Sequence, residues 1–435
     1  MVLGLLIAQF ALPRRFAFLP LLIAICHFQN IPVIEVGGAF STAKLVIVAG
    51  LFRASRERRL VWNARQRLDL LVAAWGVWQI LSGFAHHPKD YNPLTIRLSL
   101  VFDFVGAYLY ARAFLANRDD FARFAKCLAM VMLPLALLVL VERTTLRNFY
   151  GVLGGGDEVA AVRNGRVRAA GPFGHPILCG TFAAAALIIL VSLRRQNPRW
   201  FFAGVGASVL VVFGSASSGP LMTLFSGLSA LALWRFRTSI GWIRRMAITG
   251  IVCLHIIMPW PVWYLMARVD LAGGSTGWHR AELITASITY LDEWWLIGTE
   301  ITRHWMPYGI EWSEDKTDIT NHYLAMGVNG GLLLMFLFIA ILVRIFQMLG
   351  RHIRILRNAK NPDEFTLWCV GATMFAHTFT FISVSYFDQN AVMLSLLFGA
   401  VPGLCAVARK IPAKPVAGVE PAAAQPEKNS PAARS

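Results

Sequence analysis

The chain has 435 residues, of which 56% are hydrophobic and only 15% charged, and its formal net charge is +17. A soluble domain carries about 25% charged residues, so this composition argues against a soluble globular protein. Alternating patterns of strand length are absent, which argues against a transmembrane barrel. The basic residues lie mostly between apolar runs, as the positive-inside rule expects, and we therefore expect no nucleic-acid partner.

Apolar runs long enough to cross a membrane recur along the chain and predict about twelve transmembrane helices. The first is the region 2–28, which is interrupted at Pro13-Arg14-Arg15 and is interpreted as a retained signal anchor. The other predicted spans are residues 39–52, 68–85, 94–115, 128–141, 177–193, 201–213, 221–234, 246–266, 323–346, 365–386 and 391–408. The sequence thus predicts an all-α, polytopic bundle over residues 1–410 and a disordered tail, rich in Pro and Ala, at 411–435.

The alternation of arginine-rich and arginine-poor segments predicts the orientation of the bundle. The densest basic block, at residues 53–67, is expected to be cytoplasmic. Both termini are then cytoplasmic as well. Two long segments lie on the opposite face, namely a first loop at 142–175 and a large second loop at 268–320, between predicted spans nine and ten.

Several kinds of site are missing from the sequence. The six cysteines lie in or beside apolar runs without close pairs, which is typical of neither a disulfide framework nor a metal site. No H-x-x-H, H-E-x-x-H or P-loop pattern occurs. We therefore expect no metal, no cofactor and no ATP hydrolysis, so that the energy for a reaction comes from the substrate.

The first loop carries three arginines within six residues, Arg163, Arg166 and Arg168, shortly before His175 and a predicted span. Arginines on this face depart from the positive-inside rule and need an explanation. Binding of an anionic ligand is the functional explanation, because guanidinium groups bind phosphate and carboxylate oxygens in pairs. Anchoring of a helix end to lipid headgroups is the structural alternative.

The second loop contains an amphipathic helix, predicted over residues 281–296, and several polar residues. These are Arg280, Glu282, Asp292, Asp318, Asn321 and His322. Structural explanations compete here too. Arg280 paired with Glu282 would only close the loop, and His322, like His175, would only begin a helix.

Three of these segments, in this order, resemble the O-antigen ligase and polysaccharide polymerase superfamily. The first is 168–176, leading into a span, and the second is the polar turn 215–220 between two spans. The third is the second loop with Arg280, Gly298 and the segment 321–324, followed by three further glycines, Gly327, Gly330 and Gly331. The resemblance covers roughly residues 165–345 and agrees with the predicted number of spans.

The resemblance implies a metal-independent glycosyltransferase of the type C architecture in the bacterial inner membrane, with its active site facing the periplasm. Its donor would be a glycan carried on undecaprenyl diphosphate. A hydroxyl of the acceptor sugar would attack the anomeric carbon, and the lipid diphosphate would leave.

The resemblance also implies roles for individual residues. Arginines would bind the diphosphate, and a general base at the acceptor hydroxyl would contribute about 10²–10⁴-fold to the rate. The expected catalytic residues are His322 as the base, Glu282 as its competitor, and Arg280. The expected diphosphate- or substrate-binding residues are Arg168, Arg166, Arg163, His175 and Asn321.

Two enzymes and one non-enzyme fit these features. A polymerase joins repeat units of an exopolysaccharide or O-antigen, whereas a ligase transfers the glycan to lipid A-core; we favour the polymerase. The expected partners are the lipid-linked donor, an acceptor glycan or lipid A-core, membrane lipid, and chain-length regulator and flippase proteins. A lipid-glycan flippase or transporter is the third interpretation. It requires charges inside the spans, of which the sequence has few: Lys44, Arg97 and Asp103.

Overall fold

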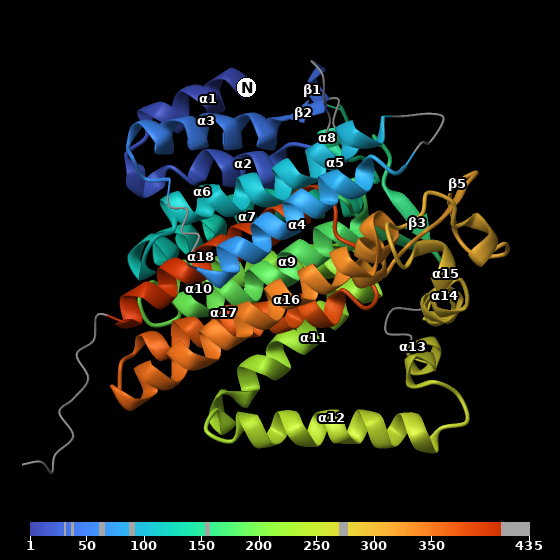
Figure 1. Cartoon of the computed structure of the whole chain (residues 1–435). Coiled ribbons are helices and arrows are strands. Elements are labelled where there is room, and N and C mark those ends of the chain that lie inside the picture. Colours follow the sequence, from blue (N-terminus) through green and yellow to red (C-terminus); the bar gives the residue numbers. More distant parts are fainter. Residues whose placement is uncertain are drawn as a thin grey trace, which may run out of the picture.

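The computed structural model describes residues 1–29, 32–35, 39–60, 66–86, 92–152, 157–268 and 277–409. Within these ranges the protein is mostly helical, with three two-stranded hairpins. Most helices run side by side, and the elements of the first and second loops gather at one end of the bundle (Figure 1). We call this end the loop end. The predicted tail at 411–435 lies outside the described residues.

The elements follow one another as the apolar runs predict. The first part contains α1 (Val2–Ala11), η1 (Arg14–Phe16), α2 (Leu19–His27), β1 (Pro32–Glu35), β2 (Ala39–Ser41), α3 (Thr42–Arg56), α4 (Arg67–Gly83), α5 (Pro93–Val101), the π-turn η2 (Phe102–Gly106), α6 (Ala107–Phe114) and α7 (Arg118–Thr145). The middle contains α8 (Phe149–Val152), β3 (Ala161–Arg163), β4 (Arg166–Arg168), α9 (Pro176–Leu190), η3 (Val191–Leu193), α10 (Pro198–Gly214), α11 (Ser218–Ala232), η4 (Leu233–Phe236) and α12 (Ile240–Ile257). The last part contains η5 (Val262–Tyr264), α13 (Leu265–Arg268), α14 (Gly277–Thr289), α15 (Leu291–Trp294), η6 (Arg303–Trp305), β5 (Glu311–Ser313), β6 (Lys316–Thr317), α16 (His322–Asn358), α17 (Asp363–Thr380) and α18 (Asp388–Arg409).

Six helical segments among the described residues are long and apolar enough to cross a membrane. They are Pro93–Phe114, Arg118–Thr145, Pro176–Leu193, Ile240–Ile257, His322–Asn358 and Asp388–Ala406. Two further helices, α1 and α10, are apolar but shorter. These helices confirm the prediction of a helical membrane protein, while the number of twelve spans stays a prediction.

The helices differ from the predicted spans where the local sequence caps or breaks them. α7 begins at Arg118, well before the predicted span at 128, because the Asn117 side chain accepts the Asp120 N–H and caps the helix. α12 ends at Ile257 instead of 266, since prolines follow at 259 and 261 and cannot continue a helix. The amphipathic helix predicted over 281–296 is two helices, α14 and α15.

α9 is the central helix, and α12 is the most exposed one. Every residue of α9 except Ile177 is buried, and the helix packs against α7, α10, α11 and α17. Its small residues allow these neighbours to approach closely, as in other membrane bundles. None of the residues of α12 is buried, and the helix lies apart from the others along the lower edge of Figure 1. The start of α9 therefore offers a fixed position from which the first loop can be held.

α16 is broken at Gly330 and Gly331, and the second loop docks into the break. Gly330 has φ −160° and ψ 25°, and Gly331 has φ 74° and ψ −177°, so neither residue is helical. The freed backbone groups are paired elsewhere. The Leu332 N–H donates to the Trp295 carbonyl at 2.8 Å, and the Trp78 indole N–H of α4 donates to the Gly330 carbonyl at 2.7 Å.

Glycines make this docking possible. Gly298, with φ 88°, and Gly331 both adopt a backbone conformation that favours glycine. A Cβ on Gly298 would overlap the Val328 carbonyl oxygen, and a Cβ on Gly331 would overlap the Leu296 carbonyl oxygen. The second loop and α16 thus touch backbone to backbone, which fixes the start of α16 relative to the loop.

We expect Gly331→Ala to destabilise the protein. The backbone conformation alone costs a residue other than glycine about 1–3 kcal/mol, and the new Cβ would also collide with the Leu296 carbonyl. The measurement is the thermal unfolding midpoint of the purified protein in detergent. Gly350→Ala, in the same helix but with nothing within 4 Å of the added Cβ, is the matched control. Equal midpoints for the two variants would contradict the role of the break.

Candidate functional site

The three arginines of the first loop lie on one face of the β3–β4 hairpin. The strands pair in the register Ala161↔Arg168 and Arg163↔Arg166. Directly paired residues of an antiparallel pair share a face, and so do residues two apart on one strand. The turn at Asn164-Gly165 has positive φ at both positions, 51° and 70°, as a tight hairpin requires. The alternation therefore places Arg163, Arg166 and Arg168 together.

A buried carboxylate holds the loop that follows the hairpin. Glu142, at the end of α7, is 1% exposed and accepts the backbone N–H groups of Ala170 and Gly171, both at 2.9 Å. From α18, the Gln389 side chain donates to the Pro172 carbonyl at 2.9 Å. The segment between Arg168 and α9 is thus bonded to two helices that lie far apart in the sequence.

Arg168 is buried and bonded to the polar turn between α10 and α11. Its Nε and Nη2 donate to the Ser217 hydroxyl oxygen at 3.3 and 2.8 Å, and its side chain and backbone together are 9% exposed. The next residue, Ala169, donates its N–H to the Gly214 carbonyl at 3.1 Å. Two of the three segments that carry the family resemblance are therefore in direct contact.

Arg280 lies on the first turns of α14 and is also buried, at 6% exposure. Its Nε has no hydrogen-bond partner among the described residues, which is costly for a buried charged donor. Its neighbour His279 donates from Nε2 to the Asp318 carbonyl at 3.0 Å and accepts the Ile310 N–H at Nδ1. This pair of bonds joins α14 to the segment that leads into α16.

The charge of Arg163 acts on residues of both loops. Burial lowers the pKa of Arg168, and the charge of Arg163 lowers it further. Burial likewise lowers the pKa of Arg280, where Asp318 raises it and Arg163 lowers it. One exposed arginine thus lies within electrostatic reach of two buried arginines from different loops. The result is a concentration of positive charge with one carboxylate beside it.

His175 belongs to the same group of residues but also caps a helix. Its Nδ1 accepts the Ile177 N–H at 3.1 Å, so it is the N-cap of α9. Desolvation, followed by the charges of Arg168 and Arg163, lowers the pKa of His175 to about 4. The ring is therefore neutral near pH 7 and carries its proton on Nε2, from which it can donate.

A cavity of about 190 Å³ adjoins the second arginine and is lined in part by Asp318. Burial raises the pKa of Asp318, and the charges of His279 and Arg280 lower it. Trp312 and Phe387 form an aromatic wall, with ring centroids 6.3 Å apart. A carboxylate beside aromatic faces is an arrangement suited to a polar ligand with apolar ring faces, such as a sugar.

Glu282 points to a different part of the second loop from Arg280. It accepts the Tyr264 hydroxyl at 2.8 Å and so ties α14 to η5. Two residues along a helix correspond to a rotation of about 200°, which explains why Arg280 and Glu282 face opposite sides. No hydrogen bond or ion pair between them occurs in the part of the chain that the structure describes. The structure therefore does not bring Glu282 to the arginine cluster.

Asn321 and His322 begin α16. The Asn321 side chain accepts the N–H groups of Tyr323 and Leu324, at 3.0 and 3.1 Å, and is thus a helix cap. His322 is 4% exposed, and its Nδ1 accepts the Tyr386 N–H at 3.1 Å. A neutral ring that accepts at Nδ1 carries its proton on Nε2. The geometry thus favours His322 as a hydrogen-bond donor over the base predicted from the sequence.

Three residues that position or extend the site had no predicted role: Glu142, Ser217 and Asp318. A carboxylate at the end of an apolar run is expensive, and this signal alone pointed to Glu142. Asp318 was among the polar residues of the second loop. Comparison of the chain with protein-family models and with curated proteins finds no match.

We expect Glu142→Gln to lower the thermal unfolding midpoint of the purified protein. A carboxylate accepts both N–H groups, whereas the amide N–H of glutamine would face one of them and leave it unpaired, at a cost of about 1–3 kcal/mol. Glu158→Gln, an exposed position in the same loop, is the control. An unchanged midpoint for Glu142→Gln would show that the two bonds contribute nothing to stability.

Proposed function

We propose that this chain is a membrane glycosyltransferase that acts on sugars carried by a lipid diphosphate. One observation carries the proposal. Two buried arginines, Arg168 and Arg280, come from loops far apart in the sequence, and the charge of Arg163 reaches both. They lie at the loop end of a helical membrane protein, where a lipid-linked substrate presents its headgroup.

Diphosphate is the ligand that suits these arginines. It carries several negative charges, and its oxygens match the fork of a guanidinium group. As a leaving group it gains negative charge when its bond to the sugar breaks, and fixed cations at such a position often contribute more to catalysis than any other single effect. The unpartnered Nε of Arg280 and the desolvated guanidinium of Arg168 supply such cations.

Asp318 is the general base that the geometry favours. In the proposed step, the Asp318 carboxylate takes the proton of an acceptor hydroxyl bound in the adjoining cavity. The hydroxyl oxygen forms a bond to the anomeric carbon, and the bond from that carbon to the diphosphate breaks. His322 then serves as a donor through Nε2, and His175 is a neutral donor beside the arginines.

The finer identity follows the family resemblance of the segments 168–176, 215–220 and 321–324. On that basis the donor is an undecaprenyl-diphosphate-linked oligosaccharide and the membrane is the bacterial inner membrane. The fold would be a type C bundle of about twelve spans with both termini in the cytoplasm, which puts the loop end in the periplasm. We favour a polymerase of an exopolysaccharide or O-antigen over a ligase to lipid A-core. Chain-length regulator and flippase proteins are the proposed partners.

A transporter of lipid-linked glycans is the second candidate, because charged residues are buried within the bundle. Lys44 Nζ lies 3.5 Å from Asp103 Oδ2, and both side chains are largely buried. Asp103 sits in the π-turn η2 of the candidate span Pro93–Phe114. Charged residues and π-turns inside membrane helices are both frequent at functional sites.

Glycan analysis of a strain that lacks the gene separates these functions. Single repeat units in place of long chains indicate a polymerase. Long chains that stay on the lipid carrier indicate a ligase. Lipid-linked units that accumulate on the cytoplasmic side indicate a transporter, and unchanged glycans would refute all three.

In the same strain, we expect Arg280→Ala to fail to restore the long glycans. Removal of one preorganised donor typically slows a reaction about 10²–10³-fold. Arg280→Lys keeps the charge without the fork and is expected to restore them only partly. The readout is a gel of surface glycans, with protein levels from an immunoblot. Arg351→Ala, an exposed arginine at the other end of α16, is the control. Normal glycans with Arg280→Ala would refute the assignment of Arg280.

We expect Asp318 to set the acid limb of the pH–rate profile. A base acts only when deprotonated, so the rate falls as the pH falls through its pKa. Burial raises the pKa of Asp318, so this limb should lie above the ordinary value of about 3.9. The measurement is the initial rate of glycan transfer by the purified protein. Asp318→Asn should be slow and lack the limb, whereas Asp315→Asn, at an exposed position, should keep it. A limb that persists in Asp318→Asn would assign the proton transfer to another group.

A further inference from the structure

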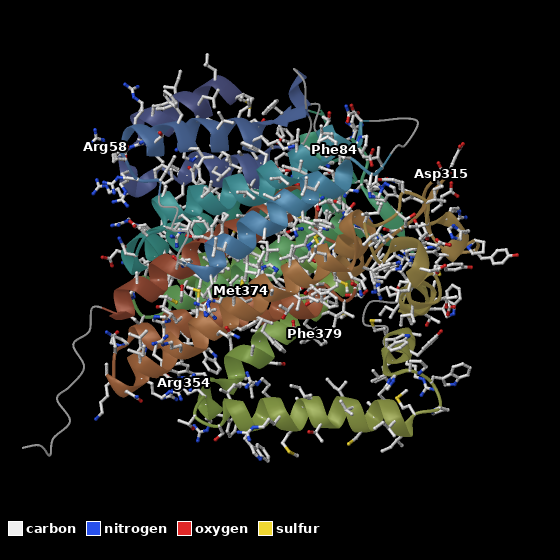
Figure 2. The ribbon with its side chains drawn as sticks, in the orientation of Figure 1. Arg58, Phe84, Asp315, Arg354, Met374 and Phe379 are labelled. Carbon is white, nitrogen blue, oxygen red and sulfur yellow. The ribbon has the colours of Figure 1, made fainter. Side chains whose placement is uncertain are left out.

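A second cavity, of about 260 Å³, lies at the opposite end of the bundle from the arginine cluster. Its walls come from three separate places: the segment after η3, the end of η4, and the turn between α16 and α17. Figure 2 labels Arg354 at this end of the molecule and Asp315 at the loop end. The two cavities therefore lie far apart, and the second has no part in the proposed transfer reaction.

The second cavity is strongly basic. It is lined by four cationic side chains, Arg195, Arg237, Arg357 and Lys360, and by one carboxylate, Glu364. Arg195 and Lys360 are exposed, and their side chains have no hydrogen-bond or ion-pair partner in the described part of the chain. The cavity thus carries an excess of three positive charges that no neighbouring carboxylate compensates.

Glu364 orients the other two arginines. Its Oε1 accepts a bond from Arg357 Nε at 2.8 Å and from Arg237 Nε at 3.2 Å. Glu364 is 7% exposed, so this shared contact is largely shielded from water. Because each arginine uses its Nε for Glu364, the terminal nitrogens remain for other acceptors, and Arg237 spends only Nη1, on the Trp234 carbonyl. The guanidinium groups are therefore held in position before any ligand binds.

Aromatic rings form the apolar side of the cavity. Trp234 and Phe365 line it and pack edge to face, with ring centroids 5.1 Å apart. Arg237 lies over the Trp234 ring at 4.3 Å, and Arg194 lies over the Phe365 ring at 3.8 Å. Tryptophan and arginine side by side at a helix end are typical of the boundary between lipid headgroups and acyl chains.

We infer that this cavity binds the phosphodiester headgroup of an anionic phospholipid. Basic pockets between membrane helices bind such headgroups, and guanidinium groups match phosphate oxygens. The volume is below the roughly 300–1,000 Å³ of sites for drug-sized ligands, which suits a headgroup. Exposed apolar residues next to the cavity in the sequence, Phe236 and Trp242, offer contacts for the acyl chains.

The experiment measures lipid binding by the full-length protein in detergent. Native mass spectrometry with added phosphatidylglycerol or phosphatidylcholine gives the apparent dissociation constant of the first bound lipid. The test variant is Arg195→Ala combined with Lys360→Ala, because it leaves the contacts of Glu364 intact. Its matched control is Arg199→Ala combined with Arg351→Ala, which removes two exposed charges outside the cavity.

We expect the wild-type protein to prefer phosphatidylglycerol, and the test variant to bind it about 30-fold more weakly, given the typical contribution of a basic residue near an anionic headgroup. The control variant should bind like the wild type. An equal loss in both variants would mean that general surface charge attracts the lipid, which overturns the site. Displacement of the lipid by inorganic phosphate at low concentration would assign the cavity to a soluble phosphate and overturn the lipid assignment.

A second variant gives an opposite prediction. Glu364→Gln keeps a side-chain acceptor for the two arginines but removes the negative charge that competes with a phosphate. It should therefore bind phosphatidylglycerol more tightly than the wild type, and its binding of phosphatidylcholine should not change. Weaker binding of phosphatidylglycerol by a folded Glu364→Gln protein would overturn the inference.

Discussion

The break in α16 at Gly330 and Gly331 is the constraint on which the geometry of the loop end depends. A continuous helix would keep its backbone groups for itself, whereas the break offers the Leu332 N–H to the Trp295 carbonyl of the second loop. The loop is thereby bonded to the bundle at its middle as well as at its ends. Glu142 does the same for the first loop. The gathering of buried arginines from both loops requires both attachments, since each loop alone carries only part of the charge.

The sequence predicts the helices and the arginine hairpin well because both depend on local patterns. Apolar runs determine where helices form, and a tight turn at Asn164-Gly165 puts the three arginines on one face. Periodicity also separates Arg280 from Glu282, since residues two apart on a helix face opposite sides. This local rule was available from the sequence and weakens Glu282 as a partner of the arginines.

Other features depend on residues that meet only in the folded chain. The bond between Arg168 and Ser217 joins segments that no local pattern connects. The protonation state of the His322 ring follows from the Tyr386 N–H, which belongs to the segment before α18. Prolines after Ile257 were visible in the sequence, yet the apolar run beyond them suggested a longer span. Tertiary partners and helix ends are therefore what an apolar pattern alone leaves undetermined.

α12 differs from every other long helix because no part of it is buried by protein. Its surroundings are supplied by the solvent of the bilayer, which rewards any sufficiently apolar surface and does not distinguish one side-chain shape from another. Selection on this helix would then act on average hydropathy alone. Among related chains, α12 would diverge fastest in sequence while it keeps its length, whereas the fully packed α9 would accept few changes.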